Sequence, residues 1–68
     1  MADKNSILDW QKIVDEAVAR RKTEGLTQRT LAALAGVSLP TLVKFEKGVT
    51  DIKLTGVLAI LKALGLAG

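Results

Sequence analysis

Four runs of helical periodicity, each closed by a glycine, constrain this 68-residue chain more than any other feature. Apolar side chains recur along each run at intervals of three and four residues, which is the period of an amphipathic α-helix. The runs end near Gly25, Gly36, Gly48 and Gly65, and glycine often ends a helix in a left-handed conformation. We therefore expect an all-α fold, a small four-helix bundle that occupies residues 1–68 as one domain.

Polar residues at the opposite ends of the runs supply the helix starts. Asp9, or Ser6 with Asp9 in the spacing of a capping box, starts the first helix. Thr27 caps the second helix and Ser38 the third, because their side-chain oxygens accept hydrogen bonds from free backbone N–H groups. Pro40 lies in the first turn of the third helix, where its missing N–H group is not needed.

The core is expected to be aliphatic, with Trp10 and Phe45 as its aromatic members. We assign to it the inward stripes of the four helices, namely Trp10, Ile13, Val14, Ala17 and Val18, then Leu31, Leu34 and Ala35, then Leu42 and Phe45, and, after a loop at residues 49–53, Leu54, Val57, Leu58, Leu61 and Leu64. The same step along the first helix reaches Arg21, a charge that needs a partner at the edge of the core. Glu46, near the inward face of the third helix, is its natural partner.

Missing residue types exclude several classes of function. The chain has no cysteine and no histidine, which removes disulfides, zinc fingers, thiol nucleophiles and the imidazole base. We expect no enzyme, no catalytic residue, no metal site and no cofactor. The polar start at residues 1–6 is unlike a secretory signal, and Lys62 interrupts the most apolar stretch, which is shorter than the roughly 20 residues of a membrane span. A cytoplasmic protein without membrane contact is expected.

The net charge of +3 belongs to one part of the chain. Residues 1–24 carry equal numbers of acidic and basic side chains, whereas residues 25–68 carry five basic and two acidic ones. The basic side chains of this second part are Arg29, Lys44, Lys47, Lys53 and Lys62. A surplus of this size is by itself only weak support for a polyanionic partner.

The segment from Leu26 to Gly48 is the most informative part of the chain. It combines a capped short helix, a tight turn that contains Gly36, and a second capped helix that bears Lys44 and Lys47. Two helices joined by a short turn with a glycine inside it form a helix-turn-helix. The front of the second helix then projects from the domain and can enter the major groove of DNA.

The chain resembles the phage-repressor (Cro/cI, XRE) helix-turn-helix family over about residues 10–66. The residues that carry the resemblance are Leu26-Thr27-Gln28, Leu31-Ala32, Ala35-Gly36-Val37-Ser38, Thr41-Leu42, Phe45-Glu46-Lys47-Gly48, Leu54, Leu58, Leu61 and Leu64-Gly65. The gapped pattern is specific, because it fixes helix caps, glycines and core leucines together. The resemblance implies a lambda-repressor-like fold that binds double-stranded DNA.

Roles for individual residues follow from the resemblance. Gln28 matches a residue that bonds a DNA phosphate in the family, and Arg21 with Glu46 matches a structural ion pair. The full DNA-binding set implied in this way is Thr27, Gln28, Arg29, Ser38, Leu39, Pro40, Thr41, Lys44 and Lys47.

The positions that face base edges depart from the family pattern. Family members often carry glutamine, arginine or serine where this chain has Leu39 and Pro40, and neither side chain can hydrogen-bond a base. Direct readout then depends on Lys44 at guanine acceptors, on Leu39 or Pro40 against a thymine methyl group, and on DNA shape. We expect modest sequence specificity.

A second apolar stripe on the fourth helix predicts self-association. Gly56, Ala59, Ile60 and Ala63 form a small-residue surface on which a two-fold mate could pack closely. The expected function is that of a transcriptional repressor that binds a palindromic operator as a homodimer, with the helix Ser38–Lys47 in the major groove.

Two other functions stay open at this point. Residues 45–54 and the Ile60-Leu61 pair are also similar to HipB-like antitoxins, which implies a protein that binds a toxin and autoregulates its operon. A module that binds only proteins is the third possibility.

Overall fold

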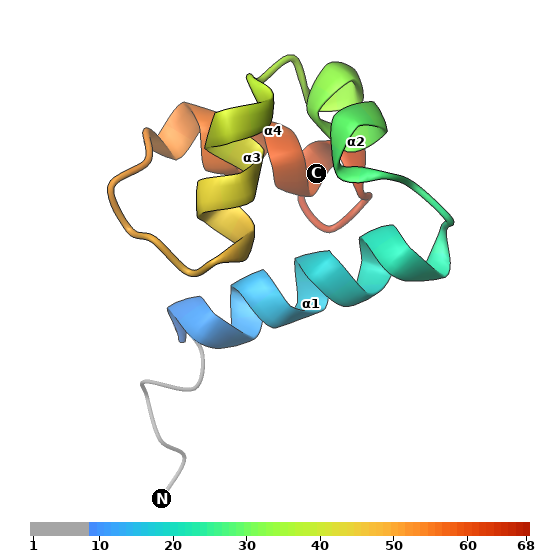
Figure 1. Ribbon diagram of the computed structural model, residues 1–68. Helices are drawn as coiled ribbons and strands as arrows, with labels where there is room; N and C mark the ends of the chain where they lie inside the picture. Colours follow the sequence, from blue (N-terminus) through green and yellow to red (C-terminus); the bar gives the residue numbers. More distant parts are fainter. Residues whose placement is uncertain (1–8) are drawn as a thin grey trace, which may run out of the picture.

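Residues 9–68, which the computed structural model describes, form four α-helices and no strand. The helices are α1 (Trp10–Thr23), α2 (Gln28–Ala35), α3 (Leu39–Glu46) and α4 (Leu54–Ala63). Figure 1 shows α1 running across one side of the domain, with α2, α3 and α4 gathered on the other side of the domain. Helix α2 packs against both α3 and α4, and α1 packs against α3. The expected all-α fold is confirmed.

Side chains cap the first three helices as the sequence predicts. Asp9 accepts from the backbone N–H of Gln11 at 3.0 Å, so the capping residue of α1 is Asp9; the alternative at Ser6 lies outside the described residues. Thr27 and Ser38 accept from the backbone N–H groups three residues further on, at 3.0 and 3.2 Å. Lys53 is the N-cap of α4, and its side chain makes no capping bond.

The core joins all four helices. Its buried members are Val14, Ala17, Leu31, Ala32, Leu42, Phe45, Val57, Ile60 and Leu64. Trp10 packs against Phe45 edge to face, with ring centroids 5.6 Å apart, and its indole N–H donates to the carbonyl of Gly48 at 3.0 Å. Because Gly48 lies two residues after the end of α3, this contact attaches the first turn of α1 to the end of α3.

Helix α4 is rotated about its axis relative to the orientation that we expected. Leu54 and Leu58, predicted to lie in the core, are 69% and 40% exposed, whereas Ile60, predicted to face outward, is fully buried. A Cβ atom on Gly56 would lie 3.8–4.0 Å from side chains of Val37, Thr41 and Ile52. A Cβ on Gly56 would therefore make ordinary van der Waals contacts with the rest of the domain, and Ile60, one turn further along the same side of α4, enters the core.

The inner face of α2 also differs from the prediction. Leu34 is 62% exposed, and Ala32 is buried beside Leu31. Helix α2 is short and rich in alanine. Because α2 packs closely against α4, the small side chain of Ala32 is buried in preference to the larger Leu34.

None of the helices in residues 9–68 combines the length and the apolarity that crossing a membrane requires.

Candidate nucleic-acid interface

The turn between α2 and α3 sets the position of the candidate interface. Gly36 has φ +74° and ψ +27°, a left-handed conformation that other residues adopt at a cost. The backbone N–H of Val37 donates to the carbonyl of Ala32 at 3.0 Å, which closes the end of α2. Ser38 then caps α3 at once, so the two helices are joined by three residues, as a helix-turn-helix requires.

Helix α3 has one buried and one exposed side. Leu42 and Phe45 are fully buried and fix the helix to the core. Pro40, Lys44 and Lys47 are exposed on the side that faces away from the domain. Lys44 and Lys47 give this exposed side a positive charge, and no acidic residue belongs to the first turn of α3.

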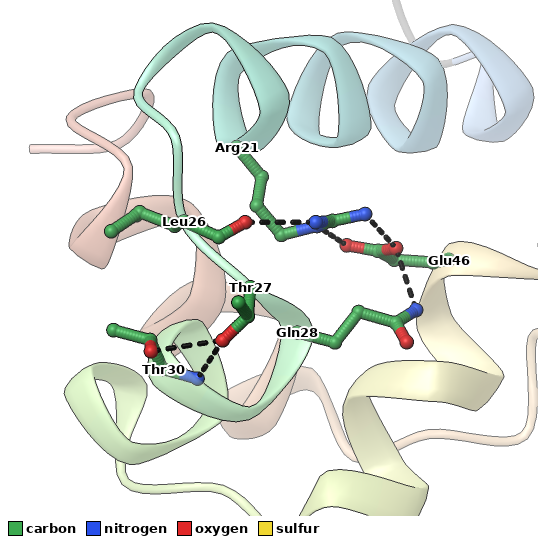
Figure 2. A network of polar contacts seen from close by, with 6 residues as sticks. All are labelled: Arg21, Leu26, Thr27, Gln28, Thr30 and Glu46. Carbon is green, nitrogen blue, oxygen red and sulfur yellow. Dashed lines mark hydrogen bonds and ion pairs between the residues drawn. The ribbon is translucent and has the colours of Figure 1, made fainter.

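A polar network holds the carboxyl-terminal end of α3 against α1 and α2 (Figure 2). Arg21 of α1 and Glu46 of α3 form a two-point ion pair, with Nε to Oε2 at 2.7 Å and Nη2 to Oε1 at 3.1 Å. The guanidinium also donates from Nη1 to the carbonyl of Leu26 at 2.9 Å. The side chains are 12% and 8% exposed, so solvent screens their attraction only partly.

Gln28 is the third side chain of this network. Its Nε2 group donates to Glu46 Oε1 at 2.9 Å, across the helix-turn-helix from α2 to α3. Glu46 therefore contacts side chains of both α1 and α2. One carboxylate thus links side chains of three helices.

Comparison with known proteins assigns the family. A helix-turn-helix family model matches residues 19–67, which include the end of α1 and all of α2, α3 and α4. The chain belongs to the helix-turn-helix family. Helix-turn-helix proteins of this type are DNA-binding regulators and not enzymes, and the expected resemblance to the Cro/cI (XRE) type is confirmed.

A curated relative supports the same assignment. The helix-turn-helix chain is 34% identical over 53 residues to an uncharacterised HTH-type transcriptional regulator of Haemophilus influenzae. The match covers 78% of this chain and 54% of that protein, so the chain spans about half the length of the relative. No solved structure matches the chain significantly.

The residues predicted to bind DNA fall into two groups in this helix-turn-helix. Thr27, Arg29, Ser38, Pro40, Lys44 and Lys47 are exposed, and Gln28, Leu39 and Thr41 are half-buried. Gln28, expected to bond a phosphate, donates its amide N–H within the domain. Arg21 and Glu46 form the expected ion pair.

The predicted self-association surface is wrong for its central residue. Ile60 is fully buried in the core and cannot contact a second copy without unfolding α4. Its neighbours Gly56, Ala59 and Ala63 are half-buried, and Gly56 lies against the turn between α2 and α3 and the loop before α4. Of the predicted stripe, Ile60 packs within the domain.

Two features of the interface were not predicted. Val43 is half-buried, and it lies three residues after Pro40 and four after Leu39. This helical spacing could have predicted that Val43 neighbours both residues on the helix surface. A hollow of about 370 Å³ also lies between the front of α3 and the start of α4. Asp51, Lys53 and Thr55 line it, and their position depends on the loop at residues 49–53, for which the sequence gives no helical pattern.

No metal site accompanies this interface in the described part of the helix-turn-helix chain, where no three acidic, histidine or cysteine side chains gather. Every buried side-chain nitrogen and oxygen among residues 9–68 has a hydrogen-bond partner.

Proposed function

We propose that this helix-turn-helix protein represses transcription by occupying a palindromic DNA operator as a dimer. The recognition element is α3, which enters the major groove by its front end. The observation that carries the proposal is the exposure of Pro40 and Lys44 along one side of a helix whose other side is fully buried. A rigidly held helix with a free, positively charged side fits between two phosphate ridges.

Charges around α3 support a polyanionic partner. Arg29, Lys47 and Lys53 are exposed on the segments that precede, end and follow this helix. Glu46, the acidic residue of α3, is paired with Arg21 and adds no free negative charge to the surface. Phosphate contacts by such side chains release condensed counterions, so binding is expected to weaken steeply with salt.

Two substitutions test the placement of α3. Lys44→Ala removes a side chain aimed at base edges and is expected to change the preference among operator variants. Arg29→Ala removes a phosphate contact, weakens binding to all sequences alike and lowers the salt slope by about one. The assay is selection from random duplexes, followed by titration of the selected site over a range of salt. If both variants bind every duplex as the parent does, α3 does not dock as proposed.

The dimer contact is assigned to the exposed leucines of α4. Leu54 and Leu58 are one helical turn apart, and burying such side chains stabilises an interface. Two copies related by a two-fold axis would present two α3 helices about 34 Å apart to one side of DNA. Leu58→Glu is expected to produce monomers in sedimentation, whereas Leu34→Glu, on α2, serves as the matched control and leaves the mass unchanged. A selected operator without two-fold symmetry would contradict the dimer.

The exposed leucines also favour a second candidate function. An antitoxin would cover Leu34, Leu54 or Leu58 with a protein toxin and still bind DNA. If the wild-type chain co-purifies with a toxin from its own cells and does not self-associate, the antitoxin function is favoured over a repressor dimer.

A further inference from the structure

The front of α3 presents an apolar side to a surface that DNA would contact. Leu39 and Val43 are half-buried and Pro40 is exposed. Val43 lies three residues from Pro40 and four from Leu39, so it neighbours both side chains on the helix surface. The leading turn of the proposed recognition helix therefore carries hydrocarbon where a base edge would approach.

Polar groups near this apolar side are largely engaged within the domain. Ser38 Oγ accepts from the backbone N–H of Thr41 at 3.2 Å, and its hydroxyl donates to Thr41 Oγ1 at 2.8 Å. Pro40 has no backbone N–H, and the Gln28 amide N–H donates to Glu46. The Thr41 hydroxyl can still donate a hydrogen bond, but Thr41 is half-buried. Hydrogen-bond donors on the exposed side of α3 are thus concentrated at Lys44 and Lys47, on its second half.

Base edges in the major groove offer one apolar group. It is the methyl group at C5 of thymine, and a methylated cytosine carries the same group at the same place. We propose that α3 distinguishes DNA sequences mainly by C5-methyl groups of pyrimidines, which pack against Leu39, Pro40 and Val43. This inference rests on the proposed DNA binding and names the chemical group that is recognised. Lys44 then reads a separate base position, and Lys47 supplies charge and orientation.

Replacing thymine by uracil tests this inference directly, because uracil lacks the methyl group and keeps every hydrogen-bonding atom of thymine. Each thymine of the selected operator is replaced in turn, and the Kd of the wild-type protein is measured by fluorescence anisotropy at fixed salt. At one or more positions in each half-site, loss of the methyl group is expected to weaken binding about four-fold. Uracil outside the half-sites serves as the control and should change nothing.

Protein variants then assign the effect to α3. Pro40→Ala and Val43→Ala should reduce the penalty of uracil, whereas Lys44→Ala should keep it while weakening binding overall. Pro40 is exposed and Val43 half-buried, so both variants can be checked for native helix content before titration. An unchanged uracil penalty in both apolar variants would show that neither Pro40 nor Val43 contacts the methyl group, and would overturn the proposal.

Two further arms complete the experiment. In the first arm, 5-methylcytosine is placed at a position where cytosine weakens binding. The added methyl group should strengthen binding about four-fold relative to cytosine. This result would show that the protein recognises the methyl group on either base. If the selected operator is bound and no uracil changes its Kd, methyl recognition is refuted while DNA binding stands. If the protein binds no duplex at low salt, both the inference and the proposed function are refuted.

Discussion

Removing the carboxylate of Glu46 should destabilise the whole domain. In Glu46→Ala, the Arg21 guanidinium keeps its bond to the carbonyl of Leu26 and loses both bonds to Oε1 and Oε2. The Gln28 amide loses its acceptor as well. A largely buried charge without its partner is costly, because the protein no longer compensates for the water that the charge gave up.

The size of the effect follows from the burial of the pair. Breaking a fully buried ion pair from one side costs about 3–5 kcal/mol. Side chains here are 12% and 8% exposed, and solvent can reach Arg21 after the substitution, so the expected loss is roughly 2–3 kcal/mol. A domain of this length has a free energy of unfolding of about 3–10 kcal/mol, so Tm should fall by roughly 10–20 °C.

Chemical denaturation followed by far-UV circular dichroism measures this loss, and the chain contains its own control. Arg20 and Glu24 also form an ion pair, but at 3.9 Å and with side chains 41% and 43% exposed. Glu24→Ala should therefore cost no more than about 0.5 kcal/mol. Replacing both members of the inner pair, Arg21→Met with Glu46→Leu, should recover most of the loss. Equal losses in Glu46→Ala and Glu24→Ala would refute the reasoning.

Two other pairs of substitutions test the fold by thermal unfolding. Gly36→Ala should lower the free energy of unfolding by about 1 kcal/mol, because the left-handed backbone at this position disfavours a side chain. This cost arises although no atom lies within 4 Å of the added Cβ. Gly56→Ala, in contrast, should stabilise α4 by about 0.5–1 kcal/mol. A gain in the first variant or a large loss in the second would contradict this assignment. Ile60→Ala should cost about 2–5 kcal/mol and Leu58→Ala less than about 1 kcal/mol, in line with their burial; the reverse order would restore the orientation of α4 expected from sequence.

Helix ends could be predicted from the sequence because their causes are local. A cap such as Thr27 bonds a backbone N–H three residues away, and Gly36 ends α2 through the conformation of its own backbone. The rotation of α4 could not be predicted in this way. Apolar residues occupy both sides of α4, and the buried side is selected by contacts with α2, which is distant in the sequence.

The same distinction holds at the candidate interface. Arg21 was identified as a charge at the edge of the core, and Glu46 as its partner, because each position follows from the period of its own helix. The bond from Gln28 to Glu46 depends on the angle between α2 and α3, which no residue pattern encodes. A flexible amide with donors and an acceptor can bond a phosphate or a carboxylate equally well, and here the carboxylate lies within reach.

Trp10 provides a practical consequence of the contact between α1 and α3. The chain has a single tryptophan, and its ring lies edge to face on Phe45 with its N–H bonded to Gly48. The fluorescence emission of the indole therefore reports whether α1 is packed against α3. Since Phe45 is on the buried side of α3, an approaching duplex would leave this fluorescence signal nearly constant, and a labelled oligonucleotide could be titrated while the same cuvette monitors whether the protein remains folded.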